Sequence, residues 1–99
     1  MQATGKRLIQ YVGNVALADI QNATHREAVS TFCAKIEQEN PRVKKAEIKG
    51  SQPHKSHDDP EDKLNVISVR FKDDVDIGLG TAHVHEDGTG KVRWNKWKK

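Results

Sequence analysis

Apolar residues recur at helical spacing in the segment that follows Thr24. The spacing places them on one face of a helix, with mostly polar residues on the opposite face. Thr24 and Glu27 have the spacing of a capping box, in which each side chain satisfies a backbone donor of the first turn. We therefore expect a helix that begins at Thr24 and ends at Asn40-Pro41. Its apolar face comprises Ala28, Val29, Phe32, Cys33 and Ile36.

The segment before this helix fits two interpretations. Residues 7–12 are rich in strand formers and Gly13-Asn14 suits a tight turn, so residues 15–20 would complete a hairpin. In the alternative, Asn14 caps one long helix that continues to Glu39. The periodicity does not separate the two interpretations, and we favour a break near residues 21–23.

The second half of the chain has the pattern of strands. Residues 43–49 and 64–71 alternate apolar and polar side chains, and residues 81–85 and 91–97 fit a hairpin. Residues 64–71 carry apolar side chains on both phases of the alternation, which predicts a bulge or burial on both faces of that strand. Residues 50–62 contain two prolines and no apolar residue, so we expect a mobile polar loop.

This order of elements predicts a single α+β domain over residues 1–99. One main helix packs on a curled antiparallel sheet of four to five strands, in the order strand or hairpin, helix, then three to four consecutive strands. The order resembles that of cystatin-like inhibitors, of the small ribonucleases of fungi and bacteria, and of β-grasp domains. The resemblance lies in element order alone, because the Gln-Val-Val-Ala-Gly loop of the cystatins is absent.

Composition narrows the class of protein. The chain is 34% apolar and 31% charged, and no apolar run approaches the ~20 residues of a membrane span. A single cysteine, Cys33, excludes an internal disulfide, which favours the cytoplasm and leaves a mature secreted form open. Cys33 also lies on the apolar helix face, so we expect it to be buried rather than nucleophilic.

The formal net charge is only +3, but the cations are concentrated at the C-terminus. Residues 91–99 combine lysines and an arginine with two tryptophans and form a basic, aromatic terminal strand and tail. Cations follow phosphates and aromatic rings stack on bases, so this composition is typical of proteins that hold single-stranded nucleic acid. An acidic protein surface is the second candidate partner. The predicted binding residues are Lys91, Arg93, Lys96, Trp97, Lys98 and Lys99.

A second hypothesis makes the protein a small ribonuclease, active or vestigial. Such an enzyme needs a general base, a general acid and a cation over the scissile phosphate. His54, Arg70 and then His83 or His85 occur in an order that looks like the small fungal ribonucleases in outline. The glutamate of those enzymes is missing, because residues 64–71 contain no acid.

Metal chemistry is a third alternative. His83 and His85 are two residues apart on a predicted strand and so point from one face, as two metal ligands would. A third ligand would have to come from His54, His57, Asp58 or Asp59 in the polar loop. The interpretation that we prefer has no metal, no cofactor and no catalytic residue. It is a small binding module that presents a basic, Trp-containing sheet surface to an acidic partner, and its oligomeric state stays open.

Overall fold

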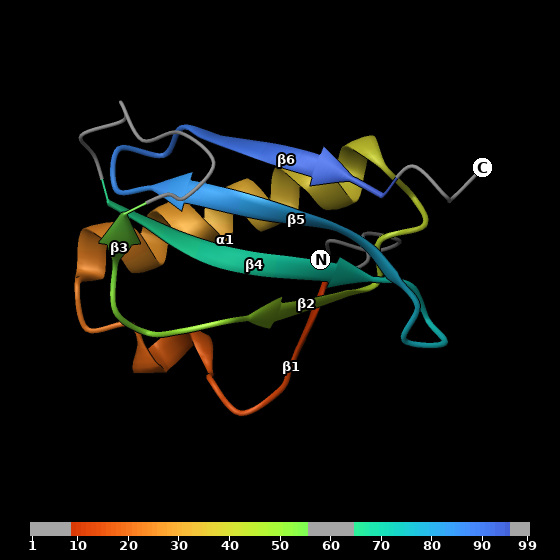
Figure 1. Ribbon diagram of the computed structural model, residues 1–99, viewed down its shortest axis with the longest axis horizontal. Coiled ribbons are helices and arrows are strands. Elements are labelled where there is room, and N and C mark those ends of the chain that lie inside the picture. The colour runs from red at the N-terminus through yellow and green to blue at the C-terminus, as the bar shows by residue number, and fades with distance from the viewer. Residues whose placement is uncertain (1–8, 56–64, 96–99) are drawn as a thin grey trace, which may run out of the picture.

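The computed structural model describes residues 9–55 and 65–95 and has the α+β fold that the sequence predicts. Its main helix lies behind the sheet in Figure 1. In chain order the elements are β1 (Gln10–Val12), the 3-10 helix η1 (Leu17–Asp19), α1 (Ala23–Glu39), β2 (Lys45–Ile48), β3 (His54–Lys55), β4 (Asn65–Lys72), β5 (Gly78–His85) and β6 (Gly90–Trp94). No helix within these described residues is long and apolar enough to cross a membrane.

The sheet is mixed, with the strand order β1-β2-β4-β5-β6 and with β3 paired to β4 beside this path. All of its pairs are antiparallel except that of β1 with β2. The parallel pair arises because α1 returns the chain to the end of the sheet at which β1 began. The sequence predicts an antiparallel sheet, and the parallel strand β1 is the difference.

The core fills the space between α1 and the sheet. Alternate residues of the strands face the helix, and the apolar helical face predicted from the sequence faces them. Burial on both sides is also present in β4, as predicted: Ile67 is buried toward the helix and Val66 on the opposite side. The buried core residues are Ile20, Ala28, Val29, Phe32, Cys33, Ile36, Val43, Ala46, Ile48, Ile67, Val69, Phe71, Leu79, Ala82 and Val84.

The N-terminal end of α1 corrects the predicted capping box. The helix begins at Ala23, and its N-cap is Asn22, whose side chain accepts a hydrogen bond from the backbone N–H of His25 at 3.0 Å. Thr24 is inside the first turn and is exposed. Asparagine caps a helix as well as threonine does. The side-chain amide of Asn22 also donates a hydrogen bond to the carboxylate of Glu86, at 2.8 Å. The predicted capping box at Thr24 was therefore wrong, and the N-cap lies two residues earlier, at Asn22.

The segment before the helix is neither a hairpin nor a continuation of the helix. The chain bends after β1 at Gly13, which adopts a φ of +93° and lies against the side chain of Glu47. It then forms η1, closed by a hydrogen bond from the backbone N–H of Ala16 to the carboxylate of Asp19. The break that we favoured near residues 21–23 is confirmed.

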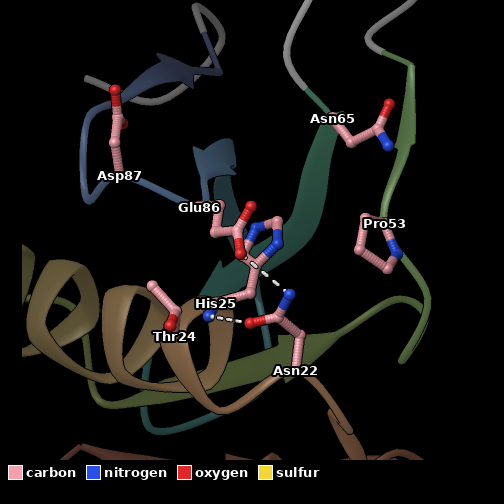
Figure 2. A pocket seen from close by; sticks show the side chains of 7 residues that line it. All are labelled: Asn22, Thr24, His25, Pro53, Asn65, Glu86 and Asp87. Carbon is pink, nitrogen blue, oxygen red and sulfur yellow. Dashed lines mark hydrogen bonds between the residues drawn. The ribbon is translucent and has the colours of Figure 1, made fainter.

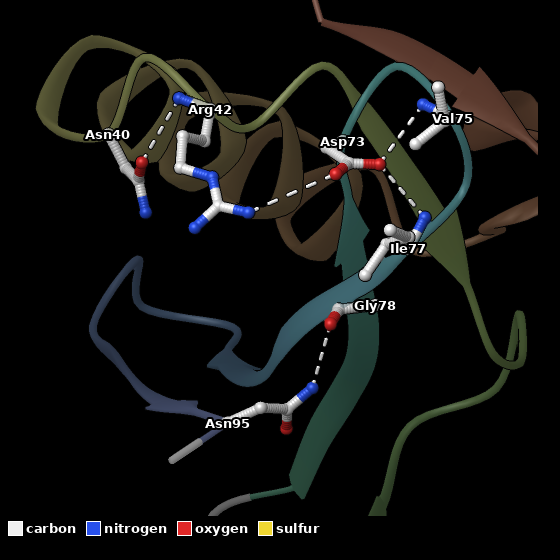
Figure 3. Close-up of polar contacts among 7 residues, drawn as sticks. All are labelled: Asn40, Arg42, Asp73, Val75, Ile77, Gly78 and Asn95. Carbon is white, nitrogen blue, oxygen red and sulfur yellow. Dashed lines mark hydrogen bonds and ion pairs between the residues drawn. The ribbon is translucent and has the colours of Figure 1, made fainter. Parts of the chain in front are cut away.

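The loop before β5 is organised by one carboxylate. The Oδ1 of Asp73 accepts hydrogen bonds from the backbone N–H groups of Val75 and Ile77, and its Oδ2 lies 4.0 Å from the guanidinium of Arg42 (Figure 3). The side chain of Asn95 donates to the carbonyl of Gly78 at the start of β5. These contacts connect the end of the helix and both ends of the β5–β6 hairpin to one turn.

Strand β3 lies within the segment predicted as a mobile polar loop. His54 is the register partner of Val66, and Lys55 is the partner of Asn65, so the first part of the segment is attached to β4. Residues 56–62 of the predicted loop lie outside the described residues.

Cys33 is fully buried beside Tyr11, in agreement with the sequence. Burial raises the pKa of the Cys33 thiol to about 12, and a hydrogen bond with Tyr11 opposes this shift. Burial also raises the pKa of the Tyr11 hydroxyl above its ordinary value, with Cys33 adding to the shift. A thiol that stays protonated at neutral pH is a poor nucleophile, so Cys33 belongs to the core.

The capping assignment predicts different costs for two neighbouring substitutions. Asn22→Ala removes the acceptor for the His25 N–H and should lower the free energy of unfolding by about 1 kcal/mol. Thr24→Ala should change it by less than about 0.5 kcal/mol, because Thr24 is exposed inside the first turn. Urea unfolding of both variants measures the difference. If Thr24→Ala lowers the free energy of unfolding more than Asn22→Ala does, Thr24 is the N-cap after all.

The buried thiol and phenol predict alkaline instability. Above a pH of about 9 the unfolded chain ionises at Cys33 and then at Tyr11, whereas the folded chain holds both protons. The free energy of unfolding should therefore be unaffected by these groups below that pH and should fall as the pH rises toward 12. Denaturant titrations across this range measure the effect. At pH 8, iodoacetamide should modify Cys33 only after denaturant is added, and rapid modification of the folded protein would contradict the burial.

Candidate functional site: the open face of the sheet

The surface of the sheet opposite α1 is here called the open face, because no helix among residues 9–55 and 65–95 packs on it (Figure 1). Its residues follow from the register, since side chains alternate between the two faces of a strand. The core residues of each strand point toward α1, so their neighbours point away from it. The open face carries Lys45 and Glu47 of β2, His54 of β3, Val66, Ser68, Arg70 and Lys72 of β4, Thr81, His83 and His85 of β5, and Lys91 and Arg93 of β6.

Cations dominate this surface. Glu47 is the carboxylate that the described strands place on it, and its oxygens lie 3.1 Å from the Nζ of Lys72 and 3.6 Å from that of Lys49. The hydrogen bond from Lys72 is the main reason why the pKa of Glu47 lies below its ordinary value. Lys45 pairs with Asp76 at the edge of the sheet, at 2.7 Å. One carboxylate is thus shared among several cations, and the face keeps a positive surplus.

The histidines predicted from the sequence come together on this face. The Nε2 of His54 lies 3.2 Å from the Oγ of Ser68, and His83 is the direct register partner of Ser68 from the other side. His54 and His85 are likewise the partners of Val66 from its two sides. His54 is exposed and His83 half-buried, whereas His85 is 8% exposed.

His85 is held by a chain of hydrogen bonds in the β5–β6 turn. Its Nδ1 lies 3.1 Å from the Oγ1 of Thr89, and that hydroxyl donates its single proton to Asp87 at 2.6 Å. The hydroxyl can then only accept from His85, so Nδ1 carries a proton and the neutral ring has its lone pair on Nε2. The same hydrogen bond from Thr89 is the largest cause of a lowered pKa at Asp87. The turn therefore fixes both the orientation and the tautomer of this ring.

Arg70, the cation of the ribonuclease hypothesis, is exposed near the centre of the face. Its register partners are Glu47 on β2 and Thr81 on β5. The structure therefore brings His54, Arg70, His83 and His85 onto one surface. A glutamate also lies near Arg70 on this surface. It is Glu47 of β2, whereas the ribonuclease hypothesis considered only the residues of the strand that carries Arg70.

The metal alternative finds no third ligand in the described part of the chain, where no three His, Cys, Asp or Glu side chains are grouped as metal ligands. His83 and His85 do share a face, as the spacing predicts. The other suggested ligands His57, Asp58 and Asp59 lie outside the described residues.

The basic tail is described only in part. Lys91 and Arg93 are exposed on the open face, and Val92 and Trp94 point toward α1, as strand alternation predicts. Trp94 packs on Phe71 with ring centroids 6.1 Å apart and is 37% exposed. The other predicted binding residues, Lys96, Trp97, Lys98 and Lys99, lie outside the described residues.

Sequence reasoning missed part of this surface. Lys45, Glu47 and Lys49 alternate with the buried Ala46 and Ile48, so the alternation alone assigns the three charged residues to the face away from the core. Their neighbours on β4 follow only from the pairing of two strands that are far apart in the sequence. That pairing places Glu47 opposite Arg70.

A second concave site lies at the N-terminus of α1. A cavity of about 560 Å³ is bordered by the side chains in Figure 2, in which Asn22 bridges Glu86 and the first turn of the helix. The buried His25 contributes to its wall and bonds the carbonyl of Val84 at 2.7 Å. Glu86 and Asp87 also line this cavity, and their negative charge disfavours an anionic ligand.

No protein-family model, curated protein or solved structure matches this chain.

The tautomer of His85 is a direct test of the turn geometry. In long-range ¹H–¹⁵N NMR spectra at a pH where the ring is neutral, His85 should show the form protonated at Nδ1. Thr89→Val removes the acceptor and should shift the population toward the form protonated at Nε2, which is the more common one for a neutral imidazole without a partner. A spectrum that is unchanged by Thr89→Val would contradict the hydrogen-bond chain.

Proposed function

We propose that this protein binds single-stranded nucleic acid across the open face. The observation that carries the proposal is the one-sided charge of that face. Its cations extend across β2, β4 and β6, and Glu47 is the one carboxylate that the described strands place among them. A phosphate backbone lying across the strands would meet cations on β2, β4 and β6 and would release counterions. The cations are Lys45, Lys49, Arg70, Lys72, Lys91 and Arg93.

The shape of the face favours a single strand over a duplex. Four neighbouring strands make a surface about 15 Å wide, and no helix of the described residues projects from it to enter a major groove. Unpaired bases can lie on such a sheet and stack on imidazole or guanidinium planes, which His54, His83 and Arg70 supply. Trp94 is turned toward α1, so base stacking by tryptophan falls to Trp97, as the sequence predicts.

The tail belongs to this proposal through its composition. The side chains of Lys91 and Arg93 on β6 point to the open face. Beyond this strand, the sequence continues with Lys96, Trp97, Lys98 and Lys99. An acidic protein surface would meet the same cations, but it would not need the planar groups that lie between them. Nucleic acid therefore remains the first choice.

The binding test uses labelled single-stranded DNA of about ten nucleotides. The anisotropy of the label should rise on addition of the protein at low salt, and log Kd should vary linearly with log salt concentration. Each phosphate contact contributes about 0.7 to the slope for a single strand. Arg70→Gln and Arg93→Gln should each weaken binding and make the slope shallower by about 0.7.

Lys35→Gln is the matched control, because it removes a cation from the exposed side of α1. It should leave both Kd and the slope unchanged. If Lys35→Gln weakens binding as much as Arg70→Gln does, attraction is set by net charge and the open face is not the site. If the wild-type protein binds polyglutamate but no nucleic acid, the partner is an acidic protein and the proposal is wrong.

A further inference from the structure

Two imidazoles flank Ser68 on the open face, one from each side of β4. His54 reaches it from β3, with its Nε2 3.2 Å from the Oγ of Ser68. His83 approaches from β5 as the direct register partner of Ser68, and such partners have Cβ atoms about 5 Å apart. The exposed His54 and the half-buried His83 are both accessible from the open face. The two rings thus lie on either side of a small patch centred on Ser68.

Two cations border the same patch. Arg70 follows Ser68 by two residues on β4 and therefore points from the same face. Lys91 is the register partner of His83 on β6. A phosphate group above Ser68 would lie between two imidazoles and beside a guanidinium, with the ammonium group of Lys91 one strand further out. Cations placed in this way stabilise the charge that builds up on a phosphate during substitution at phosphorus.

We propose that this patch cleaves RNA by acid–base catalysis, with His54 and His83 as its proton-transfer groups. The inference rests on the proposed binding of single-stranded nucleic acid. One imidazole removes the proton of a ribose 2′-hydroxyl, and the 2′-oxygen forms a bond to phosphorus. The bond from phosphorus to the 5′-oxygen breaks, and the other imidazole, in its protonated form, gives its proton to that oxygen. The products are a 2′,3′-cyclic phosphate and a 5′-hydroxyl, so all atoms and charges balance without a further reactant.

The imidazoles suit this chemistry better than the glutamate of the face. Glu47 lies between Lys72 and Lys49, and its lowered pKa makes it a weak base. Imidazole is the side chain that most readily both takes up and releases a proton near neutral pH. Two of them on opposite sides of one phosphate can act as base and acid in the same step. The absence of an acid from residues 64–71 therefore does not exclude cleavage.

The assigned roles differ among the three histidines. His54 and His83 are the catalytic residues of this proposal, because both lie against the patch. Ser68 is a positioning residue, since it holds the Nε2 edge of His54 toward the centre of β4. His85 is 8% exposed and engaged in the β5–β6 turn, so it supports the end of the patch and takes no part in proton transfer.

The experiment compares two oligonucleotides of one sequence, an RNA and a copy with 2′-deoxyribose throughout, each incubated with the full chain in EDTA. The RNA should be cut and should carry 2′,3′-cyclic phosphate ends, which mass spectrometry identifies, and the deoxy copy should be bound but remain intact. His54→Gln and His83→Gln should each slow cleavage by about 10² to 10⁴-fold. Both should keep the wild-type melting temperature and the affinity for the deoxy copy to within a few-fold. Lys35→Gln, purified in the same way, should cut at the wild-type rate.

The outcomes separate this inference from the binding proposal. If the deoxy copy binds at the open face and the RNA stays intact, the cleavage inference is wrong and the binding proposal stands. If neither oligonucleotide binds nor is cut, both are wrong. Equal cleavage by the wild-type protein and by both histidine variants would show a contaminating nuclease and overturn the inference. Loss of cleavage in only one histidine variant would overturn the pairing of two imidazoles.

Discussion

The pairing of β4 with three other strands is the constraint on which the rest of the structure depends. Its register with β2, β3 and β5 decides which side chains share a face. Ile67 and Phe71 then point into the helix-covered core, while Ser68 and Arg70 point out of it. A shift of one residue would exchange these two sets and expose the core. The burial that stabilises the sheet is therefore what holds the polar groups of the open face in register.

Charge is distributed unevenly between the surfaces of this small domain. The net charge is only +3, so long-range attraction to a polyanion is modest. The carboxylates of the described residues lie mainly on α1, in the loop at Asp73 and in the turn at Asp87, and Asp76 of that loop meets Lys45 at the edge of the open face. Such an arrangement orients an approaching anion more than it accelerates its arrival. The local surplus of cations matters more here than the sum over the chain.

Local patterns predicted the local features of this fold. The apolar face of α1 around Phe32, the alternation in β4 and the β5–β6 hairpin all depend on neighbours within a few residues, and all were correct. The cap was assigned to Thr24 because two residue types with similar capping propensity stand close together, and the N-cap that the structure has, Asn22, also contacts the distant Glu86. The parallel pairing of β1 and the placement of Glu47 beside Arg70 depend on contacts across the sheet. No periodicity along the chain contains that information.

The strand at the end of the sheet has a further consequence. Among the described strands, β6 is the last of the sheet, and none of them pairs with its outer side. Lys91 and Arg93 alternate along this strand with Val92 and Trp94, and two copies that met edge to edge would bring like charges together. Such repulsion would disfavour sheet-to-sheet growth at low ionic strength. In the proposed complex, a polyanion in excess would neutralise the same cations and weaken this repulsion between copies bound side by side on one long polymer.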